Sequence, residues 1–207
     1  MITLKNVSKS FEGKKLYEDV NLTIEDGAFL CFSGPSGCGK TTLLNIIGGL
    51  EYPDSGEVIV NGKKLRKRID RFRFYREDAG YIFQNFALVE RKTVKQNLEL
   101  IPRRSRSEYS VDEALSFVGL SDKKMQKVYQ LSGGEQQRVA IARLLVKKCT
   151  VILADEPTGS LDSDNAQLVV ELLKKLNQMG KTVILVTHDS EVKKAADRVI
   201  PIESLHA

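Results

Sequence analysis

The sequence of 207 residues has few cysteines, no long apolar run and only two histidines. Its three cysteines are odd in number and lack the spacing of metal ligands, which argues against a disulfide framework and a zinc site. The longest apolar stretches, at 150–154 and 182–187, are far shorter than the ~18 residues that a membrane span needs. The N-terminus has no basic segment before an apolar run, so nothing marks the chain for secretion and we expect it in the cytoplasm.

The excess of positive charge is also small: the chain has 32 Lys and Arg and 27 Asp and Glu, which gives a net charge of +5. This excess suits an anionic ligand, an acidic membrane surface or nucleic acid, and it does not choose among them. The hydrophobic share of 42% and the charged share of 29% are typical of a globular chain. At about 150 residues per domain, the length predicts one domain with room for an inserted subdomain.

Several short apolar runs end in polar residues. The runs at 151–155 and 183–187 lack period-two alternation, which is typical of strands covered on both faces in a parallel sheet. The run at 28–33 predicts another strand, which enters a glycine-rich turn followed by a helix over 40–50. Open parallel sheets bind ligands beyond the carboxyl ends of their strands, so the polar residues after these runs are placed for chemistry.

The remaining pattern predicts a β layer and a helical block. The first nine residues alternate like a strand, and turn residues bracket a further strand over 57–60, so we expect an antiparallel β layer beside the parallel core. Between 93 and 148 the pattern is helical, which predicts an inserted helical subdomain. The sequence thus indicates an α/β fold with a mainly parallel sheet. Helices are predicted at 94–101, 111–118, 134–148 and 162–179.

The segment from Gly34 to Thr41 reads Gly-Pro-Ser-Gly-Cys-Gly-Lys-Thr and fits the phosphate-loop pattern. It follows a predicted strand and opens a predicted helix, which is the context that this pattern requires. The glycines let successive backbone N–H groups turn toward phosphate oxygens at the positive end of the helix. In such a loop Lys40 contacts the β and γ phosphates, and the Thr41 hydroxyl binds magnesium.

Two acidic residues and a histidine follow the predicted buried strands. Asp155 ends one strand, so we expect its carboxylate near the phosphate loop, where it holds magnesium. Glu156 comes directly after it and is the candidate general base. His188 follows the next strand and is predicted to contact the γ phosphate and the attacking water. His206 is assigned no function.

These residues together resemble the ATP-binding subunits of ABC transporters, and the resemblance covers the whole chain in order. Residues 131–135, Leu-Ser-Gly-Gly-Glu, are similar to that family's signature, and 136–143 to the helix that follows it. The commonest form of the signature ends in Gln where this chain has Glu135. Similar variants occur in the family, so hydrolysis is still expected, at a rate that this residue alters.

Other positions match the family's motifs in the same order. Gln84 matches its Q-loop, 160–162 its D-loop, His188 its switch histidine and Phe11 the aromatic residue that stacks on adenine. The resemblance implies that the chain hydrolyses ATP with Mg²⁺, using Glu156, His188 and Gln84 as catalytic residues. The implied magnesium ligands are Thr41, Gln84 and Asp155. The implied nucleotide contacts are Phe11, Gly34, Pro35, Ser36, Gly37, Cys38, Gly39, Lys40, Thr41, Thr42, Ser132, Gly133, Gly134, Glu135 and Asp162.

The resemblance also implies partners. The signature opens a helix N-terminus, an anion site that lies too far from the phosphate loop of the same chain, so a head-to-tail dimer is implied. A separate membrane-spanning permease is implied as well, with this chain on the inner face of the cell membrane. The whole of 1–207 would be one ATP-binding domain, with its core and β layer at 1–92 and 149–207 and the helical subdomain at 93–148.

Three segments, 81–85, 86–97 and 155–162, resemble the small ATPases of the lipoprotein-release and macrolide-export type. Within that group the similarity is greatest to bacteriocin exporters of the lactococcin kind, which implies export of a peptide, bacteriocin or antimicrobial. A cell-division ATPase that drives a membrane partner without transport is the alternative. An ABC ATPase associated with nucleic acid is a further, less favoured one.

Three surface features support further hypotheses. Residues 63–76 carry eight basic side chains against one acidic, a mixture that binds nucleic acid in some proteins. We expect instead a solvated surface segment near anionic lipid headgroups, and no nucleic acid partner. Cys38 lies beside phosphate-binding N–H groups, which favours a reactive thiolate. The apolar residues 86–89 after Gln84 predict a docking surface for the membrane partner, centred on Leu88.

Overall fold

The computed structural model describes residues 1–11 and 13–205, so the prediction for His206 lies outside the described residues. A five-stranded sheet forms its centre, and all strand pairings described in this sheet are parallel. The predicted parallel core is therefore confirmed. In sheet order the strands are β6 Ala79–Ile82, β7 Val151–Asp155, β8 Thr182–Val186, β3 Phe29–Ser33 and β9 Arg198–Pro201.

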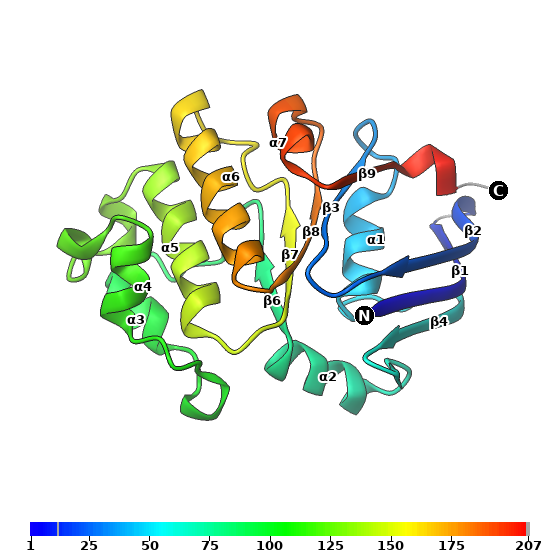
Figure 1. Ribbon diagram of the computed structural model, residues 1–207, viewed down its shortest axis with the longest axis horizontal. Coiled ribbons are helices and arrows are strands. Elements are labelled where there is room, and N and C mark those ends of the chain that lie inside the picture. Colours follow the sequence, from blue (N-terminus) through cyan, green and yellow to red (C-terminus); the bar gives the residue numbers. More distant parts are fainter. Residues whose placement is uncertain (12, 206–207) are drawn as a thin grey trace.

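A second, four-stranded sheet lies on the other side of α1 and contains the two N-terminal strands (Figure 1). Its pairings are antiparallel, which confirms the predicted β layer. Asn61 and Gly62 form the turn between its last two strands with φ of 49° and 76°, the left-handed conformation that two-residue hairpins favour. In sheet order the strands are β2 Lys14–Ile24, β1 Ile2–Phe11, β4 Ser55–Val60 and β5 Lys63–Lys64.

Helices pack around the sheets, and each helix predicted from the sequence is present within a few residues of its expected ends. Figure 1 shows α3, α4 and α5 together at one end of the molecule, where the helical subdomain is expected. The α-helices are α1 Lys40–Ile47, α2 Arg68–Glu77, α3 Val94–Glu99, α4 Val111–Phe117, α5 Gly133–Val146, α6 Ser163–Gln178 and α7 Ser190–Ala195. Short 3₁₀ helices cover Arg103–Ser105, Ser121–Lys123, Val128–Gln130 and Ile202–Leu205.

The basic segment 63–76, predicted as a solvated surface segment, is an ordered element made of β5 and α2. Two local interactions explain the helix. The carboxylate of Asp70 accepts a hydrogen bond of 3.1 Å from the backbone N–H of Lys67, which caps the first turn. Phe74 is only 3% exposed and anchors the helix in the core. The remaining side chains of α2 are exposed or half-buried, so its charges face solvent.

The parallel sheet separates two apolar clusters. Leu30 and Phe32 of β3 pack on the side of α1 and the antiparallel sheet, whereas Phe29 and Cys31 pack on the side of the helical block. Successive side chains of a strand point to opposite faces, so a strand covered on both faces is apolar throughout. The helical block has no separate core, because Leu98, Leu115 and Ile141 belong to the same cluster as the strand residues Cys31, Ile152 and Val183.

No helix within residues 1–11 and 13–205 combines the length and apolar character needed to cross a membrane.

Gly48 of the segment after α1 lies so close to Tyr81 of β6 and Leu153 of β7 that a substitution there tests how α1 packs on the parallel sheet. A methyl group at Gly48 would overlap the Tyr81 hydroxyl and come within 2.7 Å of Leu153. We expect Gly48→Ala to lower the free energy of unfolding by about 1–3 kcal/mol, the usual cost of overpacking. Within residues 1–11 and 13–205 the buried Tyr81 hydroxyl has no hydrogen-bond partner, so Tyr81→Phe alone is expected to be neutral or stabilising.

Chemical denaturation of both single variants and the double variant measures the coupling. The double variant should recover part of the loss seen in Gly48→Ala, since the overlapping oxygen is gone. Additive effects of the two substitutions would contradict the proposed clash.

Candidate nucleotide-binding site

A cleft of about 480 Å³ lies at the carboxyl edge of the parallel sheet. The loops that follow β3, β6, β7 and β8 meet there, as the position of the polar residues in the sequence predicts. The end of β1 closes one side. The lining residues are Phe11, Leu16, Ser36, Gly37, Gly39, Lys40, Thr41, Thr42, Gln84, Asp155, Glu156, Gly159 and His188.

The loop between β3 and α1 is held open by glycines in the left-handed region. Gly37 has φ 77° and Gly39 has φ 96°, conformations that other residues adopt at a cost. Gly39 is also the N-cap of α1 and provides no side-chain cap, so N–H groups of the first turn remain available. A Cβ at Gly39 would overlap the hydroxyl of Tyr17, which donates a hydrogen bond to the Gly39 carbonyl. The helix N-terminus is thus shaped for an anion.

The Lys40 ammonium lies inside this loop. Its Nζ donates hydrogen bonds of 2.8 Å to the carbonyl oxygens of both Gly34 and Pro35, and the residue is only 7% exposed. Within the described part of the chain no carboxylate forms an ion pair with Lys40. A buried cation without a counter-charge favours binding of an anion beside it.

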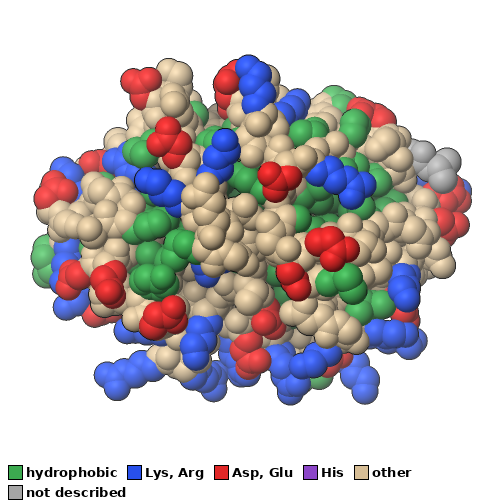
Figure 2. Space-filling view, viewed as in Figure 1, with side chains coloured by type: hydrophobic (Ala, Val, Ile, Leu, Met, Phe, Trp, Pro, Cys, Tyr) green, Lys and Arg blue, Asp and Glu red, His purple; other side chains and the backbone are tan. Residues whose placement is uncertain are grey.

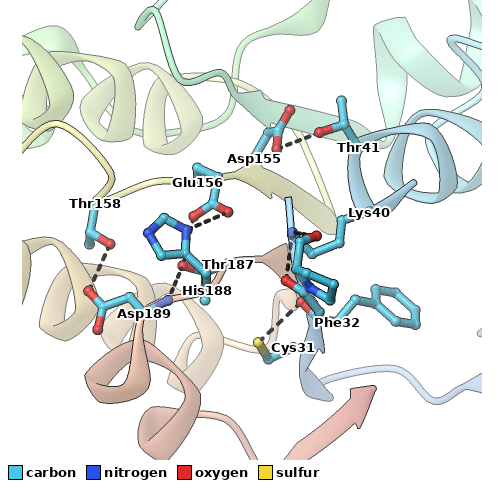
Figure 3. Close-up of polar contacts among 12 residues, drawn as sticks. Cys31, Phe32, Lys40, Thr41, Asp155, Glu156, Thr158, Thr187, His188 and Asp189 are labelled. Carbon is cyan, nitrogen blue, oxygen red and sulfur yellow. Dashed lines mark hydrogen bonds and ion pairs between the residues drawn. The ribbon is translucent and has the colours of Figure 1, made fainter. Parts of the chain in front are cut away.

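Thr41 and Asp155 bring two hard oxygen donors together. The Thr41 hydroxyl donates a hydrogen bond of 3.0 Å to Asp155 Oδ1 (Figure 3). Burial raises the pKa of the Asp155 carboxyl, the Thr41 hydrogen bond opposes that shift, and the nearby Glu156 carboxylate adds to it. Magnesium prefers one or two protein oxygen ligands together with phosphate and water, so this pair fits Mg²⁺ better than a metal held by protein alone. Among the described residues no group of three or more His, Cys, Asp or Glu could hold a metal.

Contacts with the last residue of β8 and with the two residues that follow it hold Glu156 in place (Figure 3). Its N–H donates to the Val186 carbonyl at 3.0 Å, its Oε2 accepts from the Thr187 hydroxyl at 2.9 Å, and its Oε1 lies 3.0 Å from His188 Nδ1. Its backbone has φ 44°, a left-handed conformation that costs about 1–3 kcal/mol in a non-glycine residue. The Glu156 side chain is 16% exposed and that of His188 is 67% exposed. The carboxylate is therefore fixed, while the imidazole reaches toward the open cleft.

Thr187 extends this network toward the next loop. The buried Thr187 hydroxyl accepts a hydrogen bond from the Asp189 N–H at 3.0 Å, so its own proton is directed to Glu156. The Asp189 carboxylate in turn accepts from the Thr158 hydroxyl at 3.3 Å. Sequence reasoning did not assign Thr187, although it directly precedes His188 at the end of a predicted buried strand. Leu16 and Gly159, which also line the cleft, carry no motif that would have identified them.

Phe11 and Gln84 reach the cleft from its sides. The Phe11 ring is 61% exposed at the end of β1, where it lines the cleft and is free to stack on a flat ligand. Gln84 is exposed two residues after the end of β6. Both belong to the cleft that holds Lys40, Thr41 and Asp155, as predicted.

Three residues of the phosphate loop, Gly34, Pro35 and Cys38, do not line the cleft. Gly34 and Pro35 contribute carbonyl oxygens to Lys40 instead. Cys38 is half-buried and packs against the apolar cluster beneath α1, and a Cβ at Gly34 would lie 2.8 Å from its Sγ. The Cys38 side chain is therefore partly directed toward the core, and the reactivity of its thiol stays a prediction.

The signature residues form a helix start outside this cleft. Ser132 is the N-cap of α5: its hydroxyl accepts from the Glu135 N–H at 3.2 Å, and the Glu135 carboxylate accepts from the Ser132 N–H at 2.8 Å. Glu135 thus completes a capping box in the chain's own helix. Gly134 packs so closely on Asn165 of α6 that a Cβ would overlap its side chain. Gly133 begins α5, and none of these residues lines the cleft.

Asp162 also serves a helix rather than the cleft. It is the N-cap of α6, and its carboxylate accepts from the backbone and side-chain N–H groups of Asn165. These hydrogen bonds lower the pKa of the Asp162 carboxyl. Because Asn165 contacts Asp162, Gly134 and Arg138, it joins the signature helix to the loop before α6.

In the segment after Gln84, Ala87 and Val89 are exposed as the sequence predicts, whereas Leu88 is not. Leu88 is half-buried and packs against the core cluster of the helical block, so it does not form the exposed docking surface that the sequence predicted. Phe86 and Ala87 adopt positive φ of 60° and 47°, and their carbonyls accept hydrogen bonds from the guanidinium of Arg143 on α5. The segment is therefore fastened to the signature helix.

An anion-shaped loop before α1, a buried lysine and an aspartate ending β7 beside a threonine define a P-loop nucleotide hydrolase. The family model described as ABC transporter matches residues 17–159, most of the chain, and this chain belongs to that family. It contains the family's ATPase domain, which confirms the predicted fold class and enzyme class.

Related proteins cover nearly the whole chain. The ABC transporter ATP-binding protein YvrO of Bacillus subtilis is 43% identical over 97% of this chain and 92% of its own length. The macrolide export ATP-binding/permease protein MacB of Campylobacter jejuni is 41% identical over 98% of this chain, which spans only 33% of MacB. The methionine import ATP-binding protein MetN of Clostridium acetobutylicum is 42% identical over 99% of this chain and 66% of MetN.

Solved structures agree with the fold. A dimeric structure of the ABC transporter cassette MJ0796 of Methanocaldococcus jannaschii matches with a TM-score of 0.86 and 41% identity, over 97% of this chain and 94% of that chain. A dimeric post-hydrolysis state of MJ0796 bound to ADP and Pi has a TM-score of 0.83 and 39% identity over the same shares.

Because burial raises the pKa of Asp155, we expect this carboxylate to lower the free energy of unfolding when no ligand is bound. Without nucleotide and magnesium, Asp155→Asn should raise the free energy of unfolding near neutral pH, because the amide avoids burial of a charge and can still accept from Thr41. A raised folded-state pKa disfavours the charged native state above that pKa, so the gain should vanish below the ordinary aspartate pKa of about 3.9.

Urea denaturation at neutral and acidic pH measures this difference. Thr41→Val serves as a control, since it removes the hydrogen bond that opposes the shift and should destabilise the protein. A variant Asp155→Asn that is less stable than the parent at neutral pH would contradict the prediction.

Proposed function

We propose that this chain binds ATP with Mg²⁺ in the cleft and hydrolyses it to drive a separate membrane-spanning partner. The observation that carries the proposal is the meeting of the phosphate loop, Asp155 and Glu156 at one edge of the sheet. Lys40 and the α1 N-terminus hold the phosphates, and Phe11 stacks on the base. Thr41, Asp155 and Gln84 hold the magnesium ion, which neutralises phosphate charge when bound.

In the proposed reaction Glu156 accepts the proton of the attacking water. Its carboxylate is fixed by the Thr187 hydroxyl at 2.9 Å, which leaves Oε1 as the oxygen that faces His188 and the cleft. His188, with its largely exposed ring, contacts the γ phosphate and orients the water. Thr187 acts as a positioning residue, since it touches Glu156 rather than the substrate.

The proposed active unit is a head-to-tail dimer. The N-terminus of α5, with Ser132, Gly133 and Gly134, is an anion site that does not line the chain's own cleft. A second copy would supply this site to the γ phosphate, together with Asp162 near its own helix start. The dimeric MJ0796 structures support this arrangement.

The proposed contact with the membrane partner is a groove of about 420 Å³ between α2, the segment after β6 and the residues following α3. Phe72, Tyr75, Phe83 and Leu100 contribute apolar surface to it. The cations of Arg143 and Lys147 also line it; burial lowers the pKa of both groups, and among the described residues neither has a carboxylate partner. The groove therefore suits a short helix with apolar side chains and one acidic residue.

The direction of transport that we propose is export, of a peptide, bacteriocin or other antimicrobial molecule. The similarity to the macrolide export protein MacB supports this proposal, whereas the comparable identity to the methionine import protein MetN supports only transport in general. In this proposal the chain lies on the cytoplasmic face of the membrane through its partner. Transport of labelled candidate peptides by vesicles that contain the partner and this chain tests the direction.

Glu156→Gln tests the general base. The amide keeps the size of the side chain and can still contact Thr187, but it cannot accept a proton. ATP hydrolysis should fall by about 10²–10⁴-fold while ATP binding is retained, because general-base catalysis has that magnitude. Steady-state phosphate release and equilibrium binding of ATP separate the two effects. Turnover within about threefold of the parent would exclude this role for Glu156.

Ser132→Arg tests the shared site in the background of Glu156→Gln, where ATP persists. The arginine adds bulk and charge at the α5 N-terminus and leaves the chain's own cleft unchanged, so ATP should bind but fail to induce a dimer on light scattering. Ser132→Ala is the matched control, because it removes only the cap, at a cost of about 0.5–2 kcal/mol. A normal dimer in Ser132→Arg would refute the proposed arrangement.

Leu100→Asp tests the groove. Leu100 is 54% exposed, so the substitution should leave the isolated chain folded while it weakens co-purification with the membrane partner by about 10-fold or more. Leu88→Asp is the contrasting variant, since its half-buried side chain packs in the core and the substitution should lower the melting temperature. Undiminished co-purification of Leu100→Asp would rule out this groove as the docking site.

A further inference from the structure

The positive charge of the chain is concentrated in one segment. Of the 32 Lys and Arg and the 27 Asp and Glu, eight basic residues and one acidic residue lie within 63–76. That leaves 24 basic against 26 acidic residues elsewhere, so the rest of the chain is slightly negative. The net charge of +5 is therefore a property of one surface and not of the molecule as a whole.

The fold adds a second basic segment to the same surface. Arg103 and Arg104, in the 3₁₀ helix after α3, lie across the groove from α2, since Arg104 lines that groove together with Tyr75 and Arg76. Figure 1 shows α2 along the lower edge of the molecule, and Figure 2 shows Lys and Arg side chains gathered along that edge. We call this surface the basic edge; it comprises Arg66, Lys67, Arg68, Arg73, Arg103 and Arg104.

The side chains of the basic edge form no ion pair within residues 1–11 and 13–205, although the charges of Arg66 and Arg73 lie close enough to Glu57 and Glu77 to lower the pKa of those carboxyls. All six side chains are exposed. Other surface cations do have partners, as Lys64 has Glu57 and Arg76 has Glu77. An accumulation of unpaired like charges repels itself, so it favours an external polyanion.

Apolar side chains accompany these charges. Ile69, Phe72 and Tyr75 lie three residues apart on α2 and are 58%, 55% and 39% exposed, while Phe74 on the opposite side is buried. Residues at this spacing share one face of a helix. Arginines lie among these apolar residues on α2, so their long side chains can reach anionic headgroups while the apolar residues meet the lipid surface.

We propose that the basic edge binds the anionic lipid headgroups of a membrane, with Ile69 inserted at the headgroup level. The exposed aliphatic side chain of Ile69 suits a lipid surface better than single-stranded nucleic acid, which is bound by flat aromatic platforms. The groove that we propose for the membrane partner is bordered by the same helix, so a partner seated there would bring the basic edge to the bilayer.

Sedimentation of the whole protein with vesicles tests this proposal without ATP or the membrane partner, so its failure would leave the proposed ATPase function intact. One set of vesicles contains phosphatidylcholine alone, and the other contains phosphatidylcholine with phosphatidylglycerol. The protein should bind the second set and not the first, and high salt should release it. Each basic side chain near an anionic leaflet contributes about fivefold to the affinity.

Arg68→Gln/Arg73→Gln/Arg103→Gln should therefore lose about 100-fold in affinity for the anionic vesicles. Lys174→Gln/Lys175→Gln/Arg198→Gln is the matched control, because it removes the same charge from exposed positions on α6 and β9 and should bind like the parent. Ile69→Ser should bind more weakly with its charges intact. ATP binding in all of these variants reports that the cleft is still folded.

Two results would overturn the proposal. One is equal binding to the two sets of vesicles, or equal loss in the control triple variant, which would make the attraction a matter of net charge. The other is tighter binding to a single-stranded oligonucleotide than to the anionic vesicles, lost on substitution of Arg68, Arg73 and Arg103, which would assign the basic edge to nucleic acid instead.

Discussion

Burial of the parallel sheet on both faces is the constraint on which the rest of the structure depends. Strands such as β3 and β8 have apolar side chains on each side, one set against α1 and the other against the helical block. Polar and charged groups are excluded from both faces because their burial without partners is costly. They collect where the strands end, and Asp155, Glu156, Thr187 and His188 all lie at that edge. The position of the cleft is therefore a consequence of how the core is built.

The cleft concentrates features that reduce stability. Lys40 is buried without a carboxylate partner in the part of the chain that the structure describes, the pKa of Asp155 is raised by burial, and Glu156 has a left-handed backbone. Each feature is tolerated because neighbouring groups hold it: carbonyl oxygens for Lys40, the Thr41 hydroxyl for Asp155, and the end of β8 for Glu156. Such strain is typical of functional sites, where a bound ligand compensates for it.

The helix starts at Ser132 and Asp162 show how one side chain serves two purposes. Each residue caps its own helix, and each belongs to a motif that the family resemblance assigns to the nucleotide. Asn165 contacts both regions, so the α5 and α6 starts are joined as one surface. Because this surface is directed away from the chain's own cleft, the capped helix ends can be rigid before a partner copy arrives.

The sequence by itself determined the elements and the chemistry at their ends. Glycines and a lysine before a helix, and acidic residues after an apolar run, are local patterns, so the phosphate loop, β7, β8 and all five predicted helices were found, whereas α2 and α7 were not predicted. The family resemblance then identified Gln84, Phe11 and the signature, which local patterns do not distinguish from other polar or aromatic residues. The alternation of the first nine residues and the Asn61-Gly62 turn likewise predicted the antiparallel layer, whereas the pairing of β1 with β4 is known only from the structure.

Only the tertiary structure decided which side chains face the cleft and which face the core. Cys38 and Leu88 have neighbours in the sequence that suggest exposure, but both pack partly against the core, because contacts from distant segments set their orientation. The role of Thr187 depends on Glu156, 31 positions earlier in the chain. The joining of 63–76 with 103–104 into one basic surface likewise depends on the packing of α2 against the groove. Local patterns carry information over one or two turns of chain, whereas these outcomes depend on contacts between residues far apart in sequence.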